Sequence, residues 1–111
     1  MQYKTFQIEK NLRENVLYDN DTLPLVVCSD HFDDYLHREW GCHWHDEFEL
    51  GLVLQGAVEY TIYQEHEQAM VRKIPVGDGI FLNAGCFHSA KGLVPNTVMA
   101  GIILPTTFFN T

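Results

Sequence analysis

Apolar and polar residues alternate over short stretches of this chain, and turn-forming residues separate the stretches. The clearest case is AVEYTIY at residues 57–63, where Val58, Tyr60 and Ile62 alternate with more polar neighbours. A period of two places alternate side chains on opposite faces of a β-strand with one face buried. Gln55-Gly56, just before this stretch, is typical of a turn. The pattern therefore predicts strands broken by tight turns.

The same signals predict further strands along the chain. They fall at residues 23–28, 43–54, around Met70-Val71, on both sides of the Asn83-Ala84-Gly85 turn, and at 98–104. Seven or so short strands at a spacing of roughly 8–12 residues are typical of a β-sandwich or barrel. Residues 8–17 alone favour a short helix, because Ile8, Leu12 and Val16 recur every fourth position. The predicted fold class is all-β, with this one N-terminal helix at most.

The length of 111 residues predicts one domain with its own hydrophobic core. We expect residues 1–22 to form an N-terminal arm, residues 23–104 to form the barrel, and residues 105–111 to begin a linker. Pro105 stops the last apolar stretch, and TTFFN follows it with little chain left. This end resembles a boundary at which a further domain has been removed.

Charge and cysteine content exclude several functional classes. The formal net charge is -8, from seven Lys and Arg against fifteen Asp and Glu, so the domain should repel the phosphates of nucleic acids. Three cysteines without a CxxC pair argue against a secreted disulfide framework. Neither a signal peptide nor an apolar stretch of membrane-spanning length is recognisable. We therefore expect a cytoplasmic protein with no membrane partner.

The candidate chemistry lies in HWHDEFE, residues 43–49. Residues 43, 45 and 49 of a regular strand share one face, so His43, His45 and Glu49 should converge. His88, after the Asn83-Ala84-Gly85 turn, is the fourth candidate. Imidazoles with a carboxylate suit Zn, Ni, Fe or Mn. Cys86 would share the face of His88, but a small buried residue is the interpretation that we favour for it.

Aromatic residues extend this prediction from a metal site to a ligand site. No catalytic residue is predicted, and the predicted ligand contacts are His43, His45, Glu49, His88, Trp44 and Tyr60. On the opposite face of the predicted strand 43–54, the apolar residues Phe48, Leu50, Leu52 and Leu54 need cover from the other sheet, the N-terminal segment or a partner subunit.

Two stretches resemble the conserved motifs of the cupin family. HWHDEFELGLVLQG is similar to the first motif, from His43 through Glu49 to Gly56. GDGIFLNAGCFH is similar to the second, with Gly77, Gly85 and His88 in the expected relation, although Asn83 replaces the usual proline and Gly92 the usual asparagine. The resemblance implies a double-stranded β-helix, the jelly-roll barrel of the cupins.

The details are similar to the N-terminal sensor domain of AraC-type transcriptional regulators. In that family a cupin barrel binds an effector or metal, mediates dimerisation and is joined to a C-terminal pair of helix-turn-helix units. The resemblance implies that His43, His45, Glu49 and His88 line the barrel cavity. It also implies a small-molecule effector, sugar-like in one interpretation, a homodimer, and DNA contact only through a C-terminal domain that is absent from this chain.

Two other interpretations stay open from the sequence. One is a stand-alone metal-dependent cupin enzyme, an isomerase or a dioxygenase, in which the four metal-ligand candidates hold the ion and Tyr60 or Glu47 acts as acid or base. The other is a structural or dimerising barrel whose histidines have no role. The replacements at Asn83 and Gly92 favour the regulator.

Overall fold

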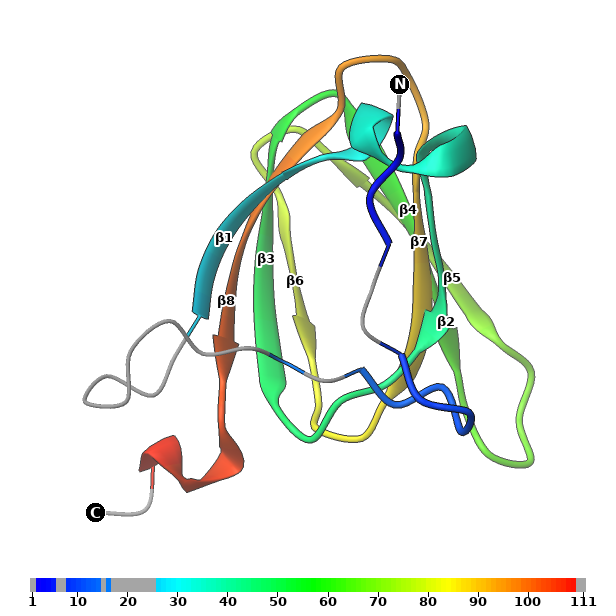
Figure 1. Cartoon of the computed structure of the whole chain (residues 1–111), viewed down its shortest axis with the longest axis vertical. Helices are drawn as coiled ribbons and strands as arrows, with labels where there is room; N and C mark the ends of the chain where they lie inside the picture. Colours follow the sequence, from blue (N-terminus) through cyan, green and yellow to red (C-terminus); the bar gives the residue numbers. More distant parts are fainter. Residues whose placement is uncertain (1, 6–7, 15, 17–25, 110–111) are drawn as a thin grey trace.

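Two antiparallel four-stranded sheets face each other in this protein (Figure 1). The computed structural model describes residues 2–5, 8–14, 16 and 26–109. The first sheet has the order β1 (Val26–His31), β8 (Val98–Leu104), β3 (Phe48–Gln55), β6 (Gly79–Leu82). The second has the order β2 (Glu39–His43), β7 (Phe87–Gly92), β4 (Ala57–Tyr63), β5 (Met70–Pro75). The only helical elements among the described residues are short 3-10 turns, at Phe32–Asp34 (η1), Leu36–Arg38 (η2) and Thr106–Phe109 (η3). The predicted all-β cupin jelly roll is confirmed.

Several predicted strands and turns are confirmed in detail. β4 begins after a turn in which Gly56 has a φ of 78°, a conformation that glycine adopts without strain. β5 ends at Pro75, which cannot donate a hydrogen bond to a neighbouring strand. β6 and β7 flank the predicted turn, where Gly85 has a φ of 75°. In the predicted linker, residues 106–109 form η3, and residues 110 and 111 lie outside the described residues.

The single strand predicted over residues 43–54 is wrong. β2 ends at His43 in the second sheet, and β3 begins at Phe48 in the first. One strand cannot pair in both sheets, so residues 44–47 carry the chain across. The polar run His-Asp-Glu suits this crossing, because the ring of His45 bonds the carbonyl of Glu47 within it. The start of β2 was not predicted, since Gly41 weakens its strand signal.

The helix predicted for residues 8–17 is also wrong over its described part. Residues 8–14 turn back on themselves: Ile8 bridges to Glu14, and Leu12 has a left-handed φ of 71°. Arg13 forms a bridge with Trp44, so pairing with the barrel replaces intrahelical bonds. The described residues leave out three parts of these predictions. They are residues 15 and 17 of the predicted helix, residues 23–25 of the first predicted strand, and the predicted boundary between arm and barrel.

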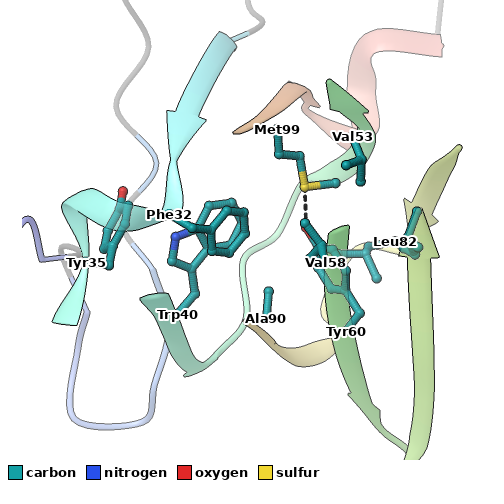
Figure 2. Close-up of a cluster of buried hydrophobic side chains, with 10 residues drawn as sticks. Phe32, Tyr35, Trp40, Val53, Val58, Tyr60, Leu82, Ala90 and Met99 are labelled. Carbon is teal, nitrogen blue, oxygen red and sulfur yellow. Dashed lines mark hydrogen bonds between the residues drawn. The ribbon is translucent and has the colours of Figure 1, made fainter. Parts of the chain in front are cut away.

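The core fills the space between the sheets with aromatic and aliphatic side chains (Figure 2). Phe32 stacks on Trp40 with ring centroids 4.3 Å apart. Tyr60 is fully buried, and its hydroxyl points to the sulfur of Met99 at 3.3 Å. A Cβ atom on Gly92 would lie 2.8 Å from Cβ of Phe32, so the asparagine of the cupin motif does not fit beside this core.

The outer face of the first sheet is an exposed apolar surface. Val27 and Leu50 both neighbour Ile102 in register, and Leu50 also neighbours Phe81. These four residues form one row across all four strands, and their exposed fractions range from 37% for Ile102 to 66% for Val27. Leu52 and Leu54, 43% and 49% exposed, extend the row along β3. Neither the second sheet nor any described residue buries this face.

No helix in the part of the chain that the structure describes has the length and apolar character needed to cross a membrane.

Candidate metal centre

Three buried histidines converge between the two sheets. His43 at the end of β2 and His88 on β7 are direct cross-strand neighbours, and their ring centroids lie 4.3 Å apart. His45, in the segment that crosses between the sheets, has its ring 5.4 Å from that of His88. One ring nitrogen from each residue lies within 4.8 Å of the other two, the spacing of a metal-binding set. All three residues are at most 2% exposed.

Backbone carbonyls fix the orientation of all three rings. Nδ1 of His43 lies 2.7 Å from the carbonyl oxygen of Gly41. Nδ1 of His45 lies 3.1 Å from that of Glu47, and Nδ1 of His88 lies 2.8 Å from that of Cys86. A carbonyl oxygen only accepts hydrogen bonds, so each Nδ1 carries a proton. In the neutral ring, the lone pair is then on Nε2. This arrangement, in which the second nitrogen donates to a carbonyl, is typical of metal-ligating histidines.

Burial keeps two of the three rings neutral. Desolvation, with the nearby His88, lowers the pKa of His43 to about 4. Desolvation also lowers the pKa of His88. For His45, desolvation is outweighed by the hydrogen bond to Glu49 and by the charge of Glu49, so its pKa is raised. A metal ion would bind the neutral rings of His43 and His88 without displacing a proton at neutral pH, whereas at His45 it would compete with a proton that the raised pKa favours.

The lowered pKa of His43 predicts a pH dependence of stability. The unfolded chain binds this proton near pH 6.5, and the folded protein binds it only near pH 4. Between these values the unfolded state holds more protons, so the free energy of unfolding should decrease as pH falls through this window, by about 3 kcal/mol for this group. Urea denaturation of metal-free protein at several pH values would measure the loss. His43→Gln should remove most of it, while the same substitution at the exposed His31 should not. Equal pH slopes in wild type and His43→Gln would refute this assignment.

Two carboxylates lie beside the histidines. Glu49 on β3 places one oxygen 3.2 Å from Nε2 of His45 and the other 3.4 Å from the hydroxyl of Tyr60. Burial opposes its ionisation, but the hydrogen bond from His45 and the electrostatic interactions with the nearby histidine rings outweigh burial and lower its pKa. Glu14, on the N-terminal arm, approaches Nε2 of His43 at 3.5 Å. Glu14 was not among the predicted site residues, because an arm residue distant in sequence carries no local signal.

A cavity of about 260 Å³ adjoins this centre. Residues of the N-terminal arm and of the edge strands β1 and β2 contribute to its lining. His43 and Glu49 lie in its wall, with Glu14 and Asp30 as further carboxylates. Its apolar wall includes Val26, Trp40, Met99 and Ile103. His43 therefore connects the histidine centre to a space that is large enough for a small molecule.

The structure brings five of the six predicted ligand contacts together and leaves one apart. His43, His45, His88, Glu49 and Tyr60 are neighbours, with the rings of Tyr60 and His88 6.3 Å apart. Trp44 instead donates its indole N–H to the carbonyl of Asn11 at 3.0 Å and is not in the cavity wall. Cys86 is partly buried and unpaired with other cysteines, and the metal-binding set consists of the three histidines.

Comparison with known families shows to which family this chain belongs. Residues 24–91 match the family described as the AraC-like ligand binding domain. The chain belongs to this family. It is also 32% identical over 90 residues to the uncharacterised HTH-type transcriptional regulator YdeC of Bacillus subtilis (strain 168). That match covers 79% of this chain but only 28% of the relative, so the chain spans under a third of the regulator that it resembles.

Solved structures similar to this AraC-like domain are oxalate decarboxylases from Bacillus subtilis. One variant superposes with a TM-score of 0.57 at 21% identity, covering 65% of this chain and 19% of the enzyme. Another, studied for its Mn(II) centres, gives a TM-score of 0.56 at 22% identity with the same coverage. These similarities show the cupin fold alone. The family is a ligand-binding domain, and the relative is a transcriptional regulator. Both matches agree with the prediction of a regulator domain rather than with the alternative of a cupin isomerase or dioxygenase.

Proposed function

We propose that this domain senses a small effector in its barrel, with a divalent transition metal bound at the histidine centre next to the effector. One observation carries the proposal. Three buried imidazoles, each oriented by a backbone carbonyl, place one ring nitrogen each within 4.8 Å of the others, beside a cavity. Burying three histidines without such a purpose would place polar groups in a core that apolar residues could fill at lower cost.

The donor atoms limit the choice of metal. His43, His45 and His88 would hold the ion, and Glu49, with one oxygen 3.2 Å from Nε2 of His45, would be a further ligand. Imidazole and carboxylate donors suit Zn, Ni, Fe or Mn. When bound, the ion would supply a positive centre to which an oxygen of the effector can coordinate.

The cavity wall limits the class of effector. Three carboxylates line it, from Glu14, Asp30 and Glu49, and no described lining residue is Lys or Arg. Burial raises the pKa of Asp30, which reflects the cost of a negative charge there. A second negative charge on the effector would add repulsion, whereas hydroxyl groups can donate hydrogen bonds to these oxygens. A neutral, sugar-like molecule, with an apolar face against Trp40, fits best.

Thermal unfolding with a panel of sugars and related metabolites would test the sensor. An effector at 100 times its Kd should stabilise the folded domain by about 2.7 kcal/mol. The panel should be tested on metal-free and metal-loaded protein, with no turnover expected in either. Asp30→Asn should weaken the response, while Glu39→Gln, an exposed change on β2, should not. If no compound shifts the melting temperature of either form, the sensor proposal fails.

We also propose that a second copy of the domain covers the exposed face of the first sheet. The apolar row of Val27, Ile102, Leu50 and Phe81 spans all four strands. A two-fold axis would place the same row of a second copy against it and bury both. Ile102→Lys should shift the domain from dimer to monomer in sedimentation velocity. Val71→Lys, at another exposed apolar position, on β5 of the second sheet, is the matched control. A wild-type monomer at high concentration would contradict the dimer.

In the complete regulator, we propose that DNA is contacted by a part outside these residues. The net charge of -8 opposes contact between this domain and phosphates, and the related regulator is more than three times longer than the matched region. A regulator acts where DNA is, so the proposed location is the cytoplasm. DNA binding by the 111-residue domain alone, in a gel-shift assay at physiological salt, would contradict this division of roles.

A further inference from the structure

The N-terminal arm is fixed to the segment that carries the histidines. Trp44 lies between His43 and His45, and its backbone N–H donates to the carbonyl of Leu12 at 3.1 Å. Its carbonyl accepts from the backbone N–H of Glu14 at 2.7 Å. Arg13, between Leu12 and Glu14, forms an ion pair with Asp46, two residues beyond Trp44. The arm is therefore in fixed register with the two histidines on either side of Trp44.

This register places the Glu14 carboxylate at the metal-binding nitrogen of His43. Its Oε1 is 3.5 Å from Nε2, and the two side chains are 17% and 3% exposed. Nδ1 of His43 donates to Gly41, so in the neutral ring Nε2 presents a lone pair to the carboxylate. Two electron-rich atoms facing each other in a buried site repel unless a proton or a metal cation lies between them. A metal ion at the three histidines would supply that cation.

We propose that Glu14 is a ligand of the metal centre, so that arm and barrel share the ion. This rests on the proposed metal site, and it adds a donor that the cupin motifs do not contain. With Glu49 the protein would supply three nitrogens and two carboxylates. Five donors exceed the tetrahedral set that Zn takes in structural sites and suit five- or six-coordinate Mn, Fe or Ni.

Glu47 provides a matched control for Glu14. Its carboxylate lies 3.9 Å from a ring nitrogen of His45, a separation close to that of Glu14 from His43. The nitrogen is Nδ1, which donates to a carbonyl and is turned away from the metal position. Both carboxylates are mostly buried, at 17% and 13% exposure. The two residues therefore differ mainly in which ring nitrogen they approach.

The test is a Co(II) and Mn(II) titration of the 111-residue domain against a chromophoric chelator, with Glu14→Gln and Glu47→Gln. Glu14→Gln should weaken metal affinity about 10- to 100-fold, and Glu47→Gln less than about 3-fold. Loss of a donor should also intensify the visible absorption of bound Co(II) in Glu14→Gln. Melting curves of the metal-free variants establish that they fold. As a measurement that needs no variant, metal should slow hydrogen exchange at the backbone N–H of Glu14 in wild type.

The outcomes separate this proposal from the proposed function. If wild type binds metal and Glu14→Gln matches it in affinity and Co(II) spectrum, Glu14 is not a ligand and the histidine centre stands. If wild type takes up no metal, both proposals fail. Equal weakening by Glu14→Gln and Glu47→Gln would indicate a general effect of charge and would also overturn the role of Glu14.

Discussion

Replacing His88 with glutamine is expected to weaken metal binding at least about 100-fold. His88 is the member of the set closest to both others, with ring centroids 4.3 Å from His43 and 5.4 Å from His45. Its removal leaves two imidazoles from one segment and no nitrogen from β7. Loss of residues that merely orient metal ligands costs about 10- to 100-fold, so loss of a ligand should cost more. Competition with a chelator of known affinity would measure the change.

Two controls make this result specific. His66→Gln, at an exposed histidine in the turn between β4 and β5, should leave affinity unchanged. Because His88 is buried, its substitution also affects packing, so the melting temperature of metal-free His88→Gln must be measured beside its affinity. A folded His88→Gln protein with wild-type affinity would remove His88 from the site.

The second large effect is expected at Tyr60. This side chain is fully buried in the core, and its hydroxyl contacts Met99 (Figure 2). The same hydroxyl also lies 3.4 Å from Glu49. Truncating a large buried aromatic residue removes transfer free energy and leaves a cavity, which together cost about 3–5 kcal/mol. Tyr60→Ala should therefore lower the free energy of unfolding by about that amount in urea denaturation. In a domain of marginal stability, much of the protein would then be unfolded.

Two further variants divide this effect into packing and hydrogen bonding. Tyr60→Phe keeps the ring and removes the hydroxyl, so it should cost about 1–2 kcal/mol. Tyr63→Ala, on the same strand but 45% exposed, should cost less than about 1 kcal/mol. A Tyr60→Ala cost no larger than that of Tyr63→Ala would contradict the central place of Tyr60 in the core.

Local patterns in the sequence predicted much of this fold. The alternation of Val58, Tyr60 and Ile62 marks β4 because one face of that strand is buried, and all three lie on the inner side of the barrel. Pro75 and Gly85 mark strand ends because their backbones disfavour continued pairing. Resemblance to the cupin motifs supplied the barrel topology, which depends on long-range pairing such as β1 with β8 and has no local signal.

The candidate site was predicted by residue type but not by geometry. His43, His45 and Glu49 were expected to meet on one strand face, and they meet because residues 44–47 pass from one sheet to the other. A one-dimensional pattern cannot distinguish a continuous strand from two strands joined by a short crossing. Trp44 was assigned to the ligand, yet its indole bonds the arm. Glu14 was missed because only the folded arm brings it to His43.

The most direct test of the central claim is the metal content of the purified domain after reconstitution. Metal-free protein would be incubated with Mn, Fe(II), Ni or Zn at neutral pH, desalted and analysed for metal and protein. The three oriented histidines predict one ion per chain for at least one of these metals, with the ion lost in His88→Gln. Wild-type protein that retains none of the four would contradict the metal centre and leave these histidines without the role proposed for them.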